Sequence, residues 1–465
     1  MLASMVQPIL QCRCRRRLRW PDAEGAAVSC AGRQLLRPGT DGIIAVFAGP
    51  ATRARAILGM ESTAMRAPSA LLAQAFAAIG HFYVHLFTAF YFVIVLALQA
   101  EWRLGYGELL SLWTLGSLLM GAGALPAGWL GDRWSARGMM AVFFIGIGLS
   151  SIACGLVRTP TQLMVCLAAV GLFASIYHPV GIAWLVRNAR QQGKAVGFNG
   201  IFGAVGISGA GVITGALIDF AGWRAAFIVP GVVAVASGLA FIVLARLGLV
   251  AEGIATGRAT AATSRRDMLR GFVILVFTML VSGLVFQAVQ AAMPKLFEER
   301  LAGLAGGGTL GIGSLVALVY AVGGVVQYFG GHLADRYPPK LVYVLCYLAQ
   351  VPILLVMTQT AGMPLIAAAM AVVVIGTGLL PAENIMLTRF TPERHRGLAF
   401  GLKYVVAFGT GPLALLLVSR ITAATGDFYW LLLVLAALAL AVFLAALALP
   451  GERRAVPLVT PAAAE

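Results

Sequence analysis

Twelve apolar runs, each long enough to cross a lipid bilayer, are the feature that most constrains how this 465-residue chain folds. A transmembrane helix needs about 20 predominantly apolar residues. Only 11% of the residues are charged, whereas about a quarter of a soluble domain is charged. The sequence therefore predicts an all-α membrane protein whose spans cover approximately residues 72–99, 107–130, 138–157, 162–186, 195–218, 223–247, 269–292, 311–333, 341–358, 363–387, 397–419 and 428–449.

Basic residues between the runs predict the orientation of the chain. The segments after the even-numbered runs are rich in arginine and lysine, for example Arg133, Arg187 and Arg389, and the odd-numbered segments are poor in them. Because such loops stay on the cytoplasmic side, both termini are expected to be cytoplasmic, in a bacterial inner (plasma) membrane. The net charge of +16 lies in these segments, which favours lipid contact over a nucleic-acid partner.

The longest internal polar segment, residues 249–268, separates the runs into two groups of six. It predicts an N-terminal six-helix bundle at 69–248, a cytoplasmic linker at 249–268 and a C-terminal bundle at 269–450. Residues 1–68 are arginine-rich and indicate either a disordered basic tail or a start codon assigned too early, with Met60 or Met65 as the true start. Residues 451–465 are expected to form a cytoplasmic tail.

A charged turn occurs twice, as "GWLGDRWSAR" after the second run and as "GHLADRYPPK" after the eighth. The two copies are offset by 203 residues, and other matches between the halves lie within one residue of that offset. Several matches at a nearly constant offset indicate an internal repeat. The turn residues concerned are Gly128, Asp132, Arg133 and Arg137 in the first copy, and Gly331, Asp335, Arg336 and Lys340 in the second.

Twelve runs in two groups of six, cytoplasmic termini and this doubled turn resemble the major facilitator superfamily. The resemblance implies a fold of two six-helix bundles that moves small molecules across the membrane by alternating access. It also implies that the two turns act as a conformational latch, with Asp132 near the start of span 11 at Leu398 and Asp335 near the start of span 5. An acid is stabilised at such a helix start by the unpaired N–H groups and the helix dipole. The alternative is ordinary charge at the cytoplasmic face.

The sequence departs from the family's turn in two places. Ser135 stands where glycine is usual, and the second copy carries Pro338 and Pro339. Span 5 is glycine-rich but lacks the proline of the antiporters' signature, so close helix packing is what its small residues predict.

Polar groups inside the runs are the candidates for a transport pathway, because ionisable side chains in a bilayer are costly. The resemblance implies that spans 1, 4, 7 and 10 line a central cavity, and the polar residues fall in those spans. Lys403 lies further on, in span 11. The candidates for a substrate and proton pathway are His81, His85, His178, Gln287, Gln290, Glu383 and Asn384.

Four of these candidates have a specific expected role. His81 and His85 are four residues apart and share one helix face, so they either exchange protons and bind substrate or are satisfied by backbone and hydroxyl groups. His178 precedes a helix-kinking proline in "YHP", a motif similar to one in fosmidomycin-resistance-type exporters, and otherwise stabilises the kink. Glu383 either loads and releases a proton or pairs structurally with a base at the cytoplasmic end.

These observations predict a secondary active transporter that exports an amphipathic compound or drug in a proton-coupled cycle. The alternative is proton-coupled uptake of a small metabolite. The expected partners are the substrate, protons and the bilayer, with the chain acting as a monomer. No motif for a membrane enzyme is present, and neither a cofactor, a metal ion nor a disulfide is expected, since the C-x-C pair Cys12 and Cys14 has no accompanying ligands.

Overall fold

A computed structural model describes residues 50–189, 191–253, 265–301, 303–304, 306, 308–392 and 396–451. The expectations for residues 1–49, for most of the linker at 249–268 and for the tail after residue 451 lie outside the described residues. Residues 62–465 form one compact unit.

Twelve described segments are helical, long enough and apolar enough to cross a membrane, which confirms the predicted fold class. The first six are α2 (Pro50–Ala89) with α3 (Tyr91–Trp102), α4 (Tyr106–Ser111) with α5 (Thr114–Arg133), α6 (Ala136–Leu156), α7 (Pro160–Ala174) with η1 (Tyr177–Gly181) and α8 (Ile182–Asn188), α9 (Gln192–Ala221) and α10 (Trp223–Arg246). The second six are α11 (Arg265–Arg300), α12 (Thr309–Arg336), α13 (Pro339–Gln359), α14 (Gly362–Gly378) with α15 (Leu380–Arg389), α16 (Arg396–Gly409) with α17 (Gly411–Thr425), and α18 (Tyr429–Leu447).

Two helices begin earlier than the apolar pattern indicates. α2 starts at Pro50, inside the expected tail, and α11 starts at Arg265, inside the expected linker. Residues 51–66 are mostly alanine, arginine, methionine, leucine and glutamate, which are strong helix formers, so the helix continues without an apolar face. Hydropathy identifies the apolar part of a helix that crosses the bilayer. It does not predict how far the helix continues into polar sequence outside the bilayer.

Several spans are interrupted near prolines. Span 4 passes through the π-helical turn η1, which contains Pro179, and this agrees with the kink expected there. Span 10 divides between α14 and α15 two residues before Pro381, and span 11 divides at Thr410, two residues before Pro412. A proline has no N–H and clashes with the preceding turn, so the helix must give way nearby.

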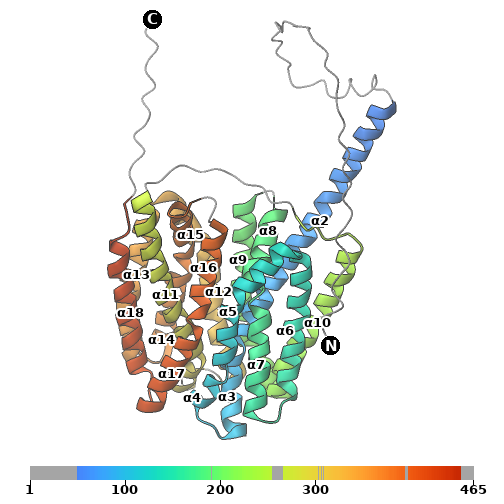
Figure 1. Cartoon of the computed structure of the whole chain (residues 1–465). Helices are drawn as coiled ribbons and strands as arrows, with labels where there is room; N and C mark the ends of the chain where they lie inside the picture. Colours follow the sequence, from blue (N-terminus) through green and yellow to red (C-terminus); the bar gives the residue numbers. More distant parts are fainter. Residues whose placement is uncertain are drawn as a thin grey trace, which may run out of the picture. The chain divides into compact units, whose positions relative to one another are not determined.

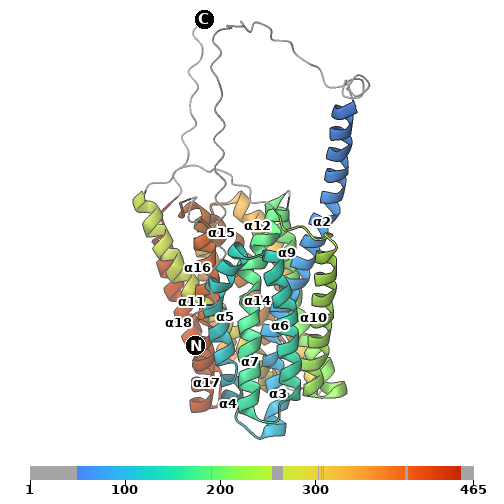
Figure 2. The same ribbon diagram turned by 45° about the vertical axis from the view of Figure 1, so that its right-hand side comes forward.

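The helices of residues 69–451 run side by side. α11, α13 and α18 of the second half lie on one side, α6 and α10 of the first half on the other, and α5, α12 and α16 between them (Figure 1). The view turned by 45° shows the same order of the two halves (Figure 2). α9 packs on α12 and α5 packs on α16, so spans 5 and 8 and spans 2 and 11 form the most extensive contacts between the halves.

Small residues allow α9 and α12 to approach closely, as the glycine pattern predicts. A Cβ atom on Gly211 would lie 2.2 Å from the carbonyl oxygen of Gly313, and one on Gly313 would lie 2.1 Å from that of Gly211. Ser208 Oγ donates a hydrogen bond to the Ala317 carbonyl, 2.8 Å away. Any side chain at either glycine would separate the two halves here.

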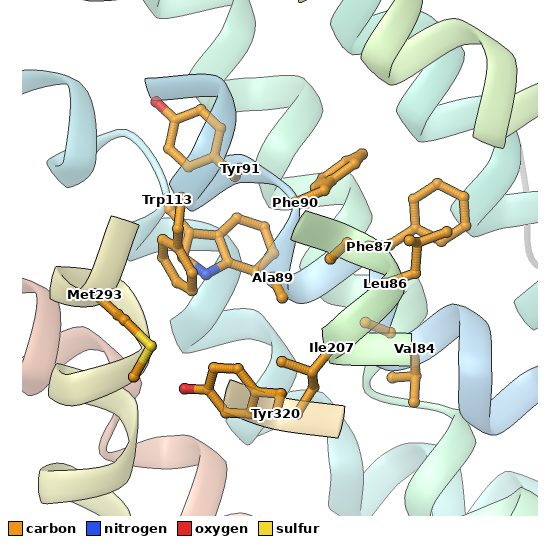
Figure 3. Packing of buried hydrophobic residues seen from close by; sticks show 14 of the residues in the cluster. Val84, Leu86, Phe87, Ala89, Phe90, Tyr91, Trp113, Ile207, Met293 and Tyr320 are labelled. Atoms are coloured by element: carbon orange, nitrogen blue, oxygen red, sulfur yellow. The ribbon is translucent and has the colours of Figure 1, made fainter. Parts of the chain in front are cut away.

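The apolar core is continuous between the halves around the break in span 1 at Phe90. Side chains of α2 and α3 gather there with Trp113, Ile207, Met293 and Tyr320 (Figure 3). Phe90 is fully buried, as is Tyr91, whose hydroxyl donates to the Leu109 carbonyl at 2.6 Å. Met293 and Tyr320 belong to the second half, so this core joins the two bundles.

Hydrogen bonds cross between the halves at the end of the bundle formed by the odd-numbered loops. Tyr106 Oη donates to the Ala291 carbonyl at 2.9 Å. Asp219, at the end of α9, accepts from the backbone N–H groups of Thr309 (3.1 Å) and Leu310 (2.8 Å) at the start of α12. A carboxylate at a helix start is a favourable arrangement, so the two halves are held together at this end.

Candidate functional site: a polar cavity between the two halves

A cavity of about 290 Å³ lies between the halves and is lined by residues of spans 1, 4, 5, 7, 8, 9, 10 and 11. Its surface is mostly apolar and aromatic, with two polar groups of side chains. The first is the histidine cluster, defined as His81, His85 and His178. The second is the ion-pair cluster, defined as Glu383, Asn384 and Lys403.

The histidine cluster joins spans 1 and 4. The ring centroids of His81 and His85 are 5.0 Å apart. The ring centroid of His178 lies 5.5 Å from that of His81 and 5.3 Å from that of His85. One ring nitrogen from each residue lies within 4.8 Å of the other two. Because successive residues of a helix turn by about 100°, His81 and His85 share a face, and the π-helical turn brings His178 opposite them.

Asn199 of span 5 fixes the orientation of His81. His81 Nδ1 lies 2.7 Å from the Asn199 backbone carbonyl oxygen, which can only accept, and 3.0 Å from the Asn199 amide Nδ2, which can only donate. The shorter contact is a hydrogen bond when Nδ1 carries the proton, and Nε2 then keeps its lone pair. Tyr177 stacks on the His81 ring at 5.1 Å, and its hydroxyl donates to the Ala77 carbonyl at 2.7 Å. Gly203 makes room for the cluster, since a Cβ there would lie 2.8 Å from the His81 ring.

The ion-pair cluster joins spans 10 and 11. Lys403 Nζ lies 2.7 Å from Glu383 Oε1, and the two side chains are only 9% and 3% exposed. Lys403 also donates to Asn384 Oδ1 at 2.6 Å, and Tyr343 donates to Glu383 Oε2 at 3.1 Å. A buried carboxylate is tolerated only with partners of this kind, so the site keeps a charge inside the protein by pairing it.

Span 11 links the two clusters. The ring of Tyr404, next to Lys403, lies 5.1 Å from that of His178, and the ring of Phe408 lies 4.6 Å from it. His178 belongs to the first half and span 11 to the second. The contacts of His178 with Tyr404 and Phe408 therefore cross between the halves and connect the histidine cluster to the helix that carries Lys403.

The predicted pathway residues are distributed unevenly. His81, His85, His178, Gln287, Glu383 and Asn384 all line the cavity. Gln290, one turn further along α11, is 8% exposed and is not among the described residues that line it.

Sequence reasoning missed several residues of the site. Asn199, Tyr177 and Tyr343 orient the charged and imidazole groups, and Gln327 and Gln350 line the cavity. An asparagine inside the apolar run of span 5 was a usable signal for Asn199. The phenols carried no signal, because a tyrosine in a span is equally suited to a membrane interface.

The first copy of the charged turn makes its contacts within its own half. Asp132 pairs with Arg187 of span 4 at 3.4 Å, and its side chain is 75% exposed. Arg133 lies over the Trp129 ring at 5.4 Å. A Cβ on Gly128 would lie 3.2 Å from Pro179 Cβ, so the turn packs on the bend of span 4. The expected contact of Asp132 with span 11 stays a prediction for another conformation.

Repeat-related cations anchor both copies of the turn to the last helix of their own half. Arg137 donates to the Val250 carbonyl at 3.0 Å, just after α10, and its Nε lies 2.5 Å from Glu252 Oε2. Lys340 donates to the Leu447 carbonyl at 2.9 Å and the Leu449 carbonyl at 2.5 Å, at the end of α18. The remaining residues of the second copy, Gly331, Asp335 and Arg336, lie at the end of α12, where Asp335 and Arg336 are exposed.

Twelve membrane-spanning helices in two packed halves, with a polar cavity between them, define a membrane transporter. Residues 77–324 and 306–465 match the model of the Major Facilitator Superfamily, and the chain belongs to this superfamily. It is therefore a transporter and not an enzyme.

Three relatives are partly similar in sequence. A probable L-galactonate transporter of Escherichia coli (strain K12) is 27% identical over 37% of this chain. A tetracenomycin C resistance and export protein of Streptomyces glaucescens is 31% identical over 28% of it, as is the puromycin resistance protein pur8 of Streptomyces alboniger. The matches span 40%, 25% and 27% of the lengths of these relatives. The resemblance to fosmidomycin-resistance-type exporters stays a prediction.

Two solved structures share the fold at low sequence identity. A D-xylose-proton symporter superposes with a TM-score of 0.65 at 15% identity, over 82% of this chain and 99% of the symporter. A bacterial homolog of the human lysosomal transporter Spinster, inward-facing and occupied, gives a TM-score of 0.61 at 13% identity over 82% of this chain and 95% of that one. These likenesses concern the fold.

Proposed function

We propose that the chain is a proton-coupled secondary transporter of a bacterial inner membrane that exports a small amphipathic compound by alternating access. The observation that carries the proposal is the buried pair of Glu383 and Lys403 in the wall of the cavity. Glu383 is the one acid among the described residues that line the cavity. Substrate and proton would compete for the same small region.

The pair supplies a coupling step in simple electrostatic terms. With Glu383 ionised, its charge holds the Lys403 ammonium and keeps it from other groups. A molecule that contacts the ionised Glu383 carboxylate competes with the proton for the same group, so the proton has to leave when the molecule binds. Binding of the molecule and loss of the proton are then mutually dependent.

The lining of the cavity supports an amphipathic substrate. Tyr404, Phe408, Phe286 and Tyr320 offer apolar and aromatic contacts, while the histidine cluster and the ion-pair cluster offer polar ones. Export is supported by the partial similarity to the two Streptomyces proteins, whose names denote drug resistance and, for one, export.

Uptake of a small metabolite is the second candidate. It is supported by the partial similarity to the probable L-galactonate transporter. A sugar acid carries a carboxylate and several hydroxyl groups, and Lys403 with the amides Gln287, Gln327 and Gln350 suits both.

The asymmetry between the two ends of the bundle supports alternating access. Hydrogen bonds from Tyr106 and Asp219 cross between the halves at the odd-loop end. At the even-loop end, the described pair of Asp132 and Arg187 stays within one half. In the opposite state, the cross-half contacts would open and the charged turns would approach the other half, where Asp132 would act as the latch.

Flux in proteoliposomes under an imposed proton gradient tests the proposal. The purified transporter is reconstituted with a pH-sensitive dye inside, and substrates are added from two panels, amphipathic drugs and sugar acids. Export coupling is supported when a drug moves against its gradient as protons move down theirs. Coupling would be refuted by identical dye responses in protein-free liposomes, or by a substrate flux that is the same with and without the proton gradient.

Cysteine labelling tests the predicted topology independently. Arg133→Cys and Arg336→Cys in a background without native cysteines should both react with an impermeant maleimide from the cytoplasmic side. Labelling of the two positions from opposite sides would exclude the arrangement of two repeated bundles.

A further inference from the structure

The histidine cluster has the composition and geometry of a metal-ion site. We propose that His81, His85 and His178 ligate one divalent transition-metal ion of the zinc class, with the remaining coordination position facing the cavity. This goes beyond the proposed function, since the ion is bound whether or not transport is coupled to protons.

The distances are compatible with an ion. The three candidate ligand nitrogens lie within 4.8 Å of one another. Zinc binds histidine nitrogen at about 2.0–2.1 Å, which places tetrahedral ligands roughly 3.3 Å apart. The ligand nitrogens therefore need to approach one another by up to about 1.5 Å, roughly what rotations of the three imidazoles provide. The glycine at position 203 is required for this arrangement, because a Cβ there would lie 2.8 Å from the His81 ring and 3.0 Å from the His85 ring.

The shorter contact of His81 suits a metal ligand. When its Nδ1 donates to the Asn199 backbone carbonyl at 2.7 Å, rather than accepting from the Asn199 amide at 3.0 Å, Nε2 is the free electron-pair donor. Metal-ligating histidines almost always donate their other ring N–H to a carbonyl, carboxylate or water in this way. Tyr177 packs against the same ring and restricts its rotation.

The other two rings have electron pairs to offer. Within the described part of the chain, His85 and His178 make ring contacts but no side-chain hydrogen bond. Both line the cavity, and His178 is only 5% exposed. A buried imidazole without a partner loses the hydrogen bonds it had in water, and a bound ion would compensate for that loss.

The donor set selects the class of ion. Three imidazoles without a carboxylate or thiolate suit zinc, copper, nickel or iron, and are poor ligands for magnesium or calcium. Three protein ligands with a fourth position left to water or another molecule describe an open zinc site. The cavity of about 290 Å³ is many times larger than an ion, so an organic ligand can share the coordination sphere.

The experiment measures ion binding by the full-length transporter in detergent, purified with an affinity tag that contains no histidine. After treatment with a chelator, the protein is titrated with Co²⁺ and Zn²⁺. We expect one Co²⁺ per chain with the visible absorption of a four-coordinate site, displaced by Zn²⁺. X-ray absorption should report three imidazole nitrogens at about 2.0 Å.

Three variants locate the site. His85→Ala and His178→Ala should each weaken binding by at least about tenfold, as expected for the loss of a ligand. His332→Ala is the matched control, because His332 is exposed at the end of α12 and far from the cluster in the chain. Monodisperse elution of each variant in size-exclusion chromatography verifies folding.

Two results would overturn the proposal. One is the absence of stoichiometric binding by the wild-type protein at 100-fold excess of Zn²⁺ over protein. The other is an equal loss of affinity in His332→Ala and in the cluster variants, which would mean surface binding. Neither result affects the role of Glu383, and a Glu383 variant that fails in flux leaves ion binding intact, so the two proposals fail separately.

Discussion

The Lys403 ammonium lies 2.7 Å from the Glu383 carboxylate inside the membrane-spanning part of the molecule, and both side chains are almost completely buried. The two residues come from neighbouring spans of the second half and form one wall of the cavity. Their partners, Asn384 and Tyr343, leave little of the charge uncompensated.

Glu383→Gln should abolish flux driven by a proton gradient and leave substrate counterflow largely intact. The amide keeps the size of the side chain but cannot bind and release a proton at physiological pH. Flux and counterflow are measured in the same proteoliposomes. Glu298→Gln is the control, since Glu298 pairs with Lys295 outside the cavity lining. Gradient-driven flux at the wild-type rate in Glu383→Gln would rule out this carboxyl as the coupling group.

Lys403→Met should lower the free energy of unfolding by about 3–5 kcal/mol, because it leaves the Glu383 carboxylate buried without its counter-ion. Adding Glu383→Gln should recover at least half of the loss, since no charge then remains buried. Thermal unfolding in detergent measures both variants. Lys295→Met breaks a more exposed pair and should cost at most about 1 kcal/mol. Equal losses in Lys403→Met and Lys295→Met would contradict the importance of the buried pair.

Asp132→Asn should slow transport at least threefold without changing insertion or thermal stability. In this structure Asp132 is 75% exposed, and exposed ion pairs contribute about 0–1 kcal/mol. A latch contact formed in the opposite state would instead affect the rate of cycling. Initial transport rates are compared with melting temperatures. If turnover stays at the wild-type value, Asp132 has no latch role.

Gly211→Ala should destabilise the fold by about 1–3 kcal/mol through overpacking, because the new methyl group would meet the Gly313 carbonyl oxygen. Gly197→Ala is the matched control in the same helix, where a Cβ would have open space. Alanine is the better helix former, so the control should be stabilised by up to about 1 kcal/mol. Similar melting temperatures for the two variants would contradict the close contact of α9 and α12.

The Arg137–Glu252 contact should lose its stabilising effect in acid. Burial opposes ionisation of Glu252, but its bonds with Arg137 and the Ala136 N–H outweigh this and lower its pKa below the ordinary 4.5. A lowered pKa means that stability is present above pH 4.5 and is lost as pH falls through the folded-state pKa. Wild-type protein and Glu252→Gln should therefore differ in melting temperature at pH 7 and converge as the pH falls below 4.5 and Glu252 becomes protonated. A pH-independent difference would contradict an ionic role.

The twelve spans and their division into halves could be predicted because hydropathy and positive charge report directly on the bilayer. The polar residues of the cavity could be selected because an ionisable side chain within a span is energetically costly and is therefore typical of a functional site. Partners were harder to predict. Nothing in the sequence pairs Glu383 with Lys403 rather than with Arg389, because the pairing depends on how span 11 packs against span 10.

The charged turn is a second case in which the sequence predicts a kind of contact but not the residue that makes it in this conformation. The sequence predicts an acid at the start of a helix of the opposite half, and assigns it to Asp132. In this conformation that arrangement occurs at Asp219, which accepts from the N–H groups that begin α12. Asp219 belongs to no repeated motif, so only the three-dimensional structure identifies it.

The position of Asp219 has a consequence for inhibition. In the alternating-access cycle that we propose, the hydrogen bonds that Asp219 accepts from Thr309 and Leu310 break when the odd-loop end separates, and the carboxylate is exposed at that surface. A compound or antibody fragment that bridges Asp219 and the first turn of α12 would hold the carrier closed on that side. Such a molecule would arrest the cycle without entering the cavity, and raising the substrate concentration would not relieve it.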